Sequence, residues 1–130
     1  MEKTYEFLKK AGTYFLATTE GDQPRVRPFG TIHLFEGRLY FQTGRKKAVA
    51  DQLRQNPKIE ISAFVDGKWI RVAATAVLDE RIAASESLLN DYPMLKSRYQ
   101  AGDGNTEVWY LRDAVSVISS FLDEPVEEKF

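Results

Sequence analysis

Two short turns, each flanked by strand-like segments, restrict the possible folds of this chain more than any other feature. Asp66-Gly67 separates residues 59–65 from residues 69–78, and both segments are rich in β-branched and aromatic side chains. Glu36-Gly37 interrupts an earlier strand-like segment in the same way. A two-residue loop that ends in glycine favours a tight hairpin, because both central residues then adopt positive φ angles. The sequence therefore predicts antiparallel strands joined by short connections.

The remaining segments add further strands to these hairpins and insert helices between them. Strands are expected at residues 14–19, at residues 25–35 with Pro24 at their start, and at residues 108–111 and 115–121. Helices are expected at residues 2–11, 46–55 and 83–100, the last of them interrupted at Pro93. About six or seven antiparallel strands, with an N-terminal helix and inserted helices, are typical of a mainly β fold that forms a small barrel.

Size and composition indicate a single domain. The chain has 130 residues, 43% of them hydrophobic, and contains no cysteine. Residues 1–130 are expected to form one domain, in which residues 123–130 are an acidic tail. The lack of cysteine excludes disulfides and thiolate chemistry, and it fits a reducing compartment. Because there is neither a secretion signal nor an apolar run of the ~20 residues that span a bilayer, we expect a cytoplasmic protein without membrane contact.

The charged residues are unevenly distributed. The formal net charge is −1, which argues against a protein that binds the phosphate backbone of nucleic acids. Residues 25–47 nevertheless carry six basic side chains and only one acidic side chain, that of Glu36. A local basic cluster on a nearly neutral protein is typical of a binding site for a small anion. The alternative is a solvated, charged face without a ligand.

The segment from Gln42 to Lys47 leads from a predicted strand into a predicted helix. The first backbone amides of a helix lack partners, and together with the helix dipole they attract an anion. Thr43 adds a hydroxyl group, and Arg45, Lys46 and Lys47 add cations at the same place. This set of donors suits a phosphate group. The alternative is an ordinary helix start with solvated lysines.

A second candidate segment precedes it, with the sequence Arg25-Val26-Arg27-Pro28-Phe29. Arg25 and Arg27 are expected on one face, because side chains alternate along a strand. Pro28 cannot donate a hydrogen bond to a neighbouring strand, so it indicates an edge strand, a bulge or a place where another body lies against the backbone. A planar ring needs such a surface. The alternative is a barrel edge with two exposed arginines.

Side chains for other kinds of chemistry are scarce. His33 is the only histidine and is interpreted as a half-buried structural residue. A chain with one histidine and no cysteine lacks the residues needed for a zinc site, for haem ligation by two histidines and for Ser-His-Asp catalysis. We therefore predict no catalytic residue and no metal ligand. Tyr92, Tyr99 and Trp109 are interpreted as core or interface residues.

The order and spacing of these segments resemble the pyridoxamine 5'-phosphate oxidase-like family of FMN-binding split barrels. Within that family, the short nitroimidazole-reductase-like and general-stress flavoproteins are most similar. The resemblance extends over about residues 5–121. It is carried by residues 15–18, 24–29 and 39–43, by Lys47, Leu53 and Asn56-Pro57, and by Trp69-Ile70-Arg71-Val72.

The resemblance implies an FMN-binding split β-barrel that works as a homodimer with two flavins at the subunit interface. It implies that Arg27 and the backbone of residues 25–29 line the flavin ring and ribityl chain. Thr43 and Lys47 would hold the phosphate with help from Arg45 or Lys46, and Trp69 would border the ring. Gln42 belongs to the same implied site. The full-length oxidases continue with a segment that helps to bind pyridoxamine phosphate, so oxidation of vitamin B6 is not expected here.

Three functions are consistent with this interpretation. The leading hypothesis is an FMN-dependent oxidoreductase that passes electrons from a reduced nicotinamide or deazaflavin donor to a small organic acceptor. The chain is rich in phosphate-binding groups and poor in catalytic side chains, which suits chemistry carried out by a bound cofactor. The alternative is a non-catalytic module that stores or senses flavin or haem. A nucleic-acid-binding barrel that uses the same cations is the least favoured, because of the net charge.

Overall fold

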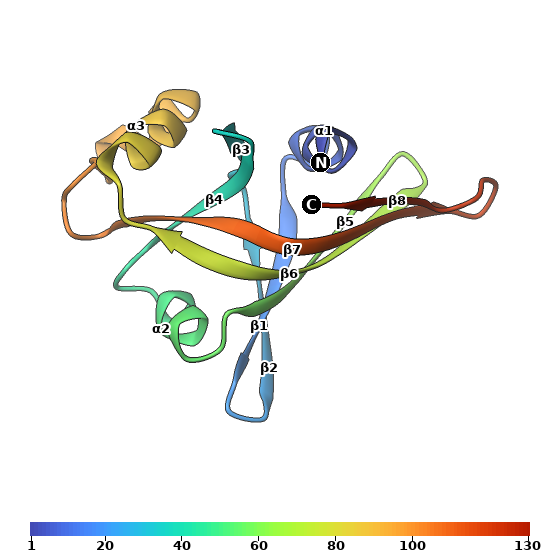
Figure 1. Ribbon diagram of the computed structural model, residues 1–130, viewed down its shortest axis with the longest axis horizontal. Coiled ribbons are helices and arrows are strands. Elements are labelled where there is room, and N and C mark those ends of the chain that lie inside the picture. Colours follow the sequence, from blue (N-terminus) through green and yellow to red (C-terminus); the bar gives the residue numbers. More distant parts are fainter.

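The computed structural model describes residues 1–130 and contains eight strands in one antiparallel sheet (Figure 1). The strands are β1 (Tyr14–Glu20), β2 (Gln23–Phe29), β3 (His33–Phe35), β4 (Arg38–Gly44), β5 (Lys58–Val65), β6 (Lys68–Asp79), β7 (Thr106–Ser120) and β8 (Val126–Lys129). The helices are α1 (Glu2–Ala11), α2 (Ala48–Gln55), α3 (Ile82–Asp91) and the 3-10 helix η1 (Pro93–Ser97). The predicted mainly β class with an N-terminal helix and inserted helices is confirmed.

The strand order is β2-β1-β5-β6-β7-β4-β3. The long strand β7 pairs with β6 on one side, while β4 and β8 share its other side. The two end strands, β2 and β3, are joined by residues 30–32 but are not paired with each other. The sheet is therefore a barrel that remains split between β2 and β3, and β2 is an edge strand, as Pro28 indicated.

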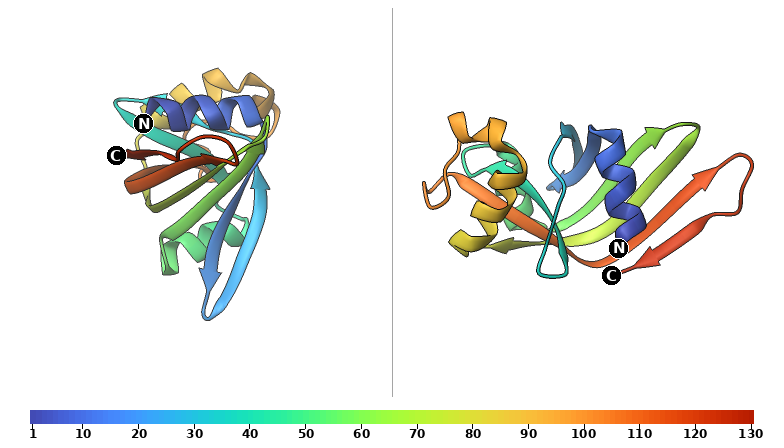
Figure 2. Two further views of the ribbon diagram at one scale, coloured as in Figure 1. Left: turned by 90° about the vertical axis from the view of Figure 1, so that its right-hand side faces the viewer. Right: turned by 90° about the horizontal axis from the view of Figure 1, so that it is seen from above.

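A core of 17 buried side chains fills the inside of the sheet. It is supplied by alternate positions of the strands, as in β5, where Ile59, Ile61 and Ala63 are buried between exposed residues. Helix α1 lies across the strands and adds Leu8 to this core (Figure 2). Its residues Tyr5, Phe7 and Ala11 also pack against the core.

Both predicted hairpin turns are confirmed. The φ angles are 48° and 72° at Glu36 and Gly37, and 51° and 76° at Asp66 and Gly67. Two successive positive φ angles define the tight hairpin turn that matches the twist of the paired strands.

Several predicted boundaries differ from the structure. The strand expected at residues 25–35 is broken after Phe29, and α2 begins at Ala48 rather than at residue 46. The helix expected at residues 83–100 is interrupted at Pro93 as predicted, because proline cannot continue the helix, but its second part, η1, ends at Ser97. The two expected closing strands are one strand, β7, with Asp113 at a φ angle of 52° where the register with β6 shifts.

The acidic C-terminal segment contains a strand that the sequence pattern did not predict. Residues Val126–Lys129 form β8, which pairs with residues 115–118 of β7. Glu128 accepts hydrogen bonds from the backbone and hydroxyl groups of Thr4 and pairs with the terminal amine of Met1. The two ends of the chain consequently lie side by side (Figure 1).

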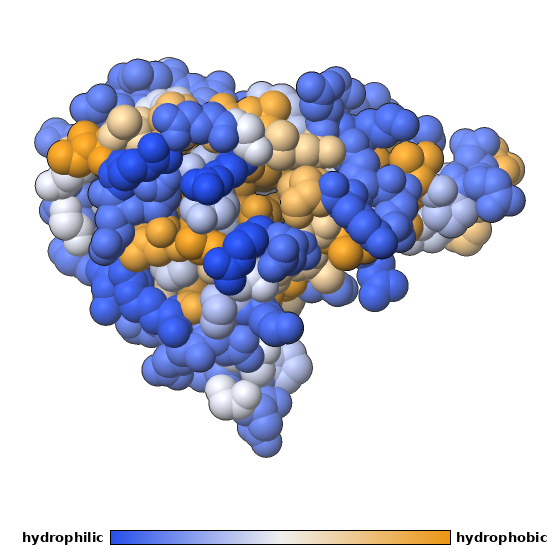
Figure 3. Space-filling view, in the orientation of Figure 1, coloured by the Kyte–Doolittle hydropathy of each residue, from blue (hydrophilic) through white to orange (hydrophobic).

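The β7–β8 hairpin projects from the rest of the molecule, at the right of Figure 1. Its tip carries Phe121 and Leu122, which are both almost fully exposed. Figure 3 shows apolar surface at the end of this hairpin and in patches between polar side chains elsewhere. None of the helices is both long and apolar enough to cross a membrane.

Candidate functional site

The start of α2 presents unpaired hydrogen-bond donors. Lys47 is the N-cap residue, and no side chain caps the helix. The amide of Ala50 bonds to the carbonyl of Lys47 at 3.0 Å, but the amides of Ala48 and Val49 have no partner in the chain. The Lys47 side chain has no ion-pair partner either. The local geometry therefore offers the amides and the cation that the sequence predicted for an anion site.

Arg27 connects β2 with β1 and α2. Its guanidinium donates to the carbonyl of Leu16 at 3.1 Å, to Oγ1 of Thr18 at 2.8 Å and to Oε1 of Gln52 at 2.5 Å. Burial, followed by the charge of Arg25, lowers the pKa of Arg27, but a guanidinium stays charged at neutral pH. This network fixes the direction of the arginine at the edge of the sheet.

The two predicted segments meet at one cavity of about 440 Å³. Arg27, Pro28 and Phe29 line it from β2, Gln42 and Thr43 line it from β4, and Lys47 and Val49 line it from the start of α2. Gln42 and Thr43 are buried, and the backbone amide of Gln42 donates to Oγ1 of Thr31 at 2.9 Å. The cavity has the size of an ordinary small-molecule site.

Three further residues line this cavity, and the sequence did not predict them as site residues. Tyr92, Met94 and Leu95, at the end of α3 and in η1, line it. The hydroxyl of Tyr92 donates to the carbonyl of Ile32 and accepts from its amide, both at 3.0 Å. The cavity is thus lined by two cations and several polar groups together with apolar side chains. Tyr92 packs against a small buried cluster, which agrees with its interpretation as a core residue, and it also lines the cavity.

Other predicted site residues lie elsewhere. Arg25 is exposed and pairs with Glu20 at 3.0 Å, and Val26 projects from the outer face of β2. Arg45 turns to Asp51 at 2.8 Å and lines a different cleft. Lys46 is exposed, and its backbone amide bonds to Asn105 at 3.2 Å. Of the predicted cations, only Arg27 and Lys47 share the cavity.

Trp69 is also separate from this cavity. It lies at the start of β6, where its ring packs against Phe121 with the ring centres 5.1 Å apart. Together with Phe15 and Phe64 it lines a different, largely apolar cavity. Within one chain, Trp69 therefore does not border the ligand space between Arg27 and Lys47.

His33 contacts a serine and an aspartate. This corrects the expectation that the chain lacks the parts of a Ser-His-Asp set. Its Nδ1 lies 2.9 Å from Oδ2 of Asp91, and its Nε2 lies 2.8 Å from Oγ of Ser87. Ser87 and Asp91 are one helical turn apart on α3. His33, Ser87 and Asp91 line none of the main cavities. The half-buried histidine fastens α3 to β3, which agrees with its structural interpretation.

The family model for pyridoxamine 5'-phosphate oxidase matches residues 1–112. A NimC/NimA family protein from Clostridium acetobutylicum is 40% identical, with a TM-score of 0.97 over 100% of this chain and 92% of that protein. The chain therefore belongs to the pyridoxamine 5'-phosphate oxidase family, together with this NimC/NimA protein. None of the curated proteins matches the sequence.

Two more distant structures share the fold. General Stress Protein 26 from Bacillus anthracis is 17% identical, with a TM-score of 0.76 over 99% of this chain and 98% of that protein. A pyridoxamine 5'-phosphate oxidase-related, FMN binding protein from Nostoc punctiforme is 18% identical, with a TM-score of 0.65 over 98% of this chain and 92% of that protein. The resemblance stated from the sequence is confirmed.

Proposed function

We propose that this chain is an FMN-binding oxidoreductase that passes electrons from a reduced nicotinamide or deazaflavin donor to a small organic acceptor. The observation that carries the proposal is that Arg27, Thr43 and Lys47 line one cavity together with Tyr92, Met94 and Leu95. Family membership and the name of the Nostoc FMN binding protein support the same assignment.

The polar groups of the cavity fit a phosphate group. Lys47 supplies a cation, Thr43 supplies a hydroxyl, and the unpaired amides of Ala48 and Val49 supply two further donors. Charge-assisted hydrogen bonds from such groups are among the stronger polar interactions in proteins. These residues would hold the phosphate of FMN. The site proposed here consequently leaves out Arg45, Lys46 and Trp69.

The remaining walls suit a planar, partly polar ring system. Arg27 stands in a fixed direction beside Pro28 and Phe29, and the edge strand β2 has backbone groups without a neighbouring strand. Tyr92, Met94 and Leu95 would help to exclude water. When bound, the flavin supplies the group that accepts electrons, and the chain supplies binding, orientation and charge.

We further propose that two copies of the chain associate through the outer face of the sheet. Phe15, Val26 and Phe64 lie on this face of the neighbouring strands β1, β2 and β5 and are 50%, 68% and 68% exposed. Large apolar side chains exposed together are typical of an interface. Since Val26 is on β2 next to Arg27, the cavity lies close to this proposed interface, where a partner could cover a bound ring.

The absorption spectrum of untreated purified protein tests the cofactor assignment. We expect the two visible bands of an oxidised flavin, or their appearance after addition of FMN to colourless protein. Protein that stays colourless with FMN would contradict the proposal, and the strong Soret band of a haem would favour the haem-binding alternative. Rapid mixing with NADH or NADPH then separates catalysis from storage, because a bound flavin that neither donor reduces favours a storage or sensor module.

A further inference from the structure

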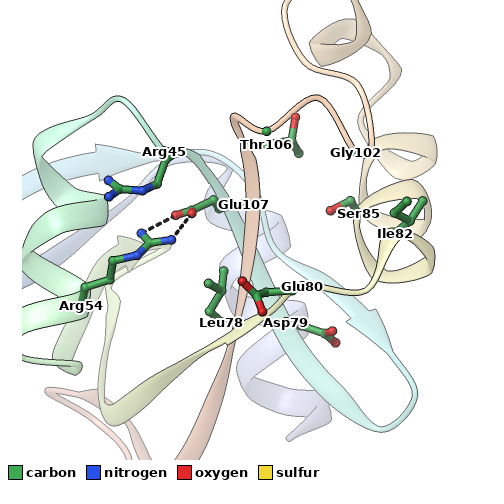
Figure 4. A pocket seen from close by; sticks show the side chains of 11 residues that line it. Arg45, Arg54, Leu78, Asp79, Glu80, Ile82, Ser85, Gly102, Thr106 and Glu107 are labelled. Atoms are coloured by element: carbon green, nitrogen blue, oxygen red, sulfur yellow. Dashed lines mark hydrogen bonds and ion pairs between the residues drawn. The ribbon is translucent and has the colours of Figure 1, made fainter.

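A second cleft, which the proposed function does not use, lies between α2 and α3 above the adjacent ends of β6 and β7 (Figure 4). It encloses about 400 Å³ and shares no lining residue with the cavity of Arg27 and Lys47. Three of its lining residues, Asp79, Ser85 and Glu107, are polar and at least nine-tenths buried. Polar side chains are rarely buried in this way without a partner.

Both cations that line the cleft are already paired within the chain. The guanidinium of Arg54 donates to both carboxylate oxygens of Glu107, as Figure 4 shows, and also to the carbonyl of Ala50 at 3.3 Å. The guanidinium of Arg45 is bonded to Asp51 at 2.8 Å. Each arginine therefore already has a carboxylate partner within the chain.

The acid Asp79 is also paired. Arg81 donates to both of its carboxylate oxygens at 3.0 Å and 2.9 Å, and the hydroxyl of Tyr40 donates to it at 2.7 Å. These hydrogen bonds, that of the Arg81 side chain above all, hold the pKa of Asp79 at about 2. Both carboxylate oxygens of Asp79 therefore already have hydrogen-bond partners within the chain.

Two polar groups of the cleft remain without a partner. Glu80 is exposed, lines the cleft, and forms neither a hydrogen bond nor an ion pair. Ser85 on α3 is only 7% exposed, yet its hydroxyl, which is directed into the cleft, has no hydrogen bond in the chain. The groups of the cleft without a hydrogen bond or ion pair are therefore the carboxylate of Glu80 and the hydroxyl of the largely buried Ser85.

We propose that this cleft binds a small organic cation, with an ammonium or guanidinium group at Glu80 and a hydroxyl or similar polar group at Ser85. The carboxylates of the cleft form no cluster of the kind that holds a metal ion, which favours an organic cation. An anionic ligand would be repelled by Glu80 and would find no unpaired arginine. The site is independent of the flavin, since it shares no residue with the proposed cofactor cavity.

Three probes of equal length test the charge that the cleft selects: 4-amino-1-butanol, uncharged 1,4-butanediol and anionic 4-hydroxybutyrate. Each is added to ¹⁵N-labelled full-length protein, and the amide shifts of Glu80, Ser85 and Glu107 are followed by NMR. We expect saturable shifts at these amides with the amine, binding of the diol weaker by about tenfold, and none with the carboxylate. Equal responses to all three probes, or the strongest response to 4-hydroxybutyrate, would overturn the proposal.

Variants then test the two unpaired groups. Glu80→Gln should weaken binding of 4-amino-1-butanol by about tenfold, and Ser85→Ala should weaken it by about threefold. Glu124→Gln is the matched control, because it removes the same charge from an exposed loop at the tip of the β7–β8 hairpin and should leave binding unchanged. Because Glu80 is exposed, its amide variant is expected to fold. If the amine binds Glu80→Gln as tightly as the unaltered protein, the assignment is wrong.

Discussion

At the scale of single residues, Arg27 has two roles that its neighbour Arg25 lacks. Its guanidinium donates hydrogen bonds to the carbonyl of Leu16 and to the side chains of Thr18 and Gln52. The same residue also lines the proposed cofactor cavity. Arg25 instead forms an exposed pair with Glu20. Two arginines that are two positions apart on one strand therefore differ because only one is packed against α2.

This difference can be measured in the absence of any ligand. Arg27→Ala removes three part-buried hydrogen bonds, so we expect the free energy of unfolding in urea to fall by about 1–3 kcal/mol. Arg25→Ala removes only an exposed ion pair and should change the free energy by less than about 0.5 kcal/mol. Equal losses for the two variants would show that the Arg27 network contributes no more than a surface contact.

Gly44 shows how a residue can be required for space rather than for backbone conformation. The φ angle of Gly44 lies outside the left-handed region, so its backbone conformation does not require glycine. A Cβ atom there would instead approach the hydroxyl of Tyr99 to 3.1 Å and its ring to 3.3 Å. The small residue allows Tyr99 to pack against the end of β4, next to Thr43.

At the scale of elements, Glu128 joins the C-terminal strand to the N-terminal helix. Burial alone would raise its pKa, but the hydroxyl of Thr4, the terminal amine and the backbone amides of Thr4 and Lys3 outweigh this and lower the pKa to about 2. Because the carboxylate bonds to the first amides of α1, it also caps that helix.

The lowered pKa predicts a stability that depends on pH. The unfolded chain takes up the proton of Glu128 near its ordinary pKa of 4.5, whereas the folded chain does so only near pH 2. The stabilisation is therefore complete above about pH 5 and is lost as the pH falls towards about 2. In Glu128→Gln, the free energy of unfolding should decrease less over this range than in the unaltered protein. In Glu124→Gln, which changes an exposed acid, the free energy of unfolding should fall with pH as steeply as in the unaltered protein. An equally steep fall in Glu128→Gln would contradict the account.

The sequence predicted the elements whose signals are local. Asp66-Gly67 and Glu36-Gly37 define their turns with their own backbone angles, and residues 59–65 alternate between the two faces of the sheet. Strand β8 was missed because Val126 is its only apolar residue and its pairing with β7 depends on the backbone. A charged edge strand has no hydrophobic pattern by which it could be recognised.

The candidate site was predictable to a similar degree. Thr43 and Lys47 are marked by the change from strand to helix, and Arg27 by its edge strand. Tyr92, Met94 and Leu95 could not be predicted as cavity residues, because only the folding of α3 against β3 brings them to the cavity. The directions of Arg45 and Lys46 depend on contacts with Asp51 and Asn105 that the local sequence does not reveal.

At the scale of the whole molecule, the exposed outer face of the sheet predicts association. We expect the protein to sediment as a dimer, and Phe64→Asp to shift it towards a monomer, because a charge on this apolar face opposes burial. Ile82→Asp is the control, since Ile82 is also exposed and apolar but lies on α3. A monomer in the unaltered protein, or dissociation caused equally by both variants, would contradict the proposed interface.

The central claim is that Lys47 and the start of α2 hold the phosphate of FMN, and binding of FMN compared with riboflavin tests it most directly. Flavin fluorescence titrations should show that the unaltered protein prefers FMN, the ligand with the phosphate. Lys47→Ala should reduce the affinity for FMN by about 10- to 100-fold and leave that for riboflavin nearly unchanged, while Lys46→Ala should preserve the preference. Equal affinities of the unaltered protein for FMN and riboflavin, or a loss of preference in Lys46→Ala alone, would contradict the account.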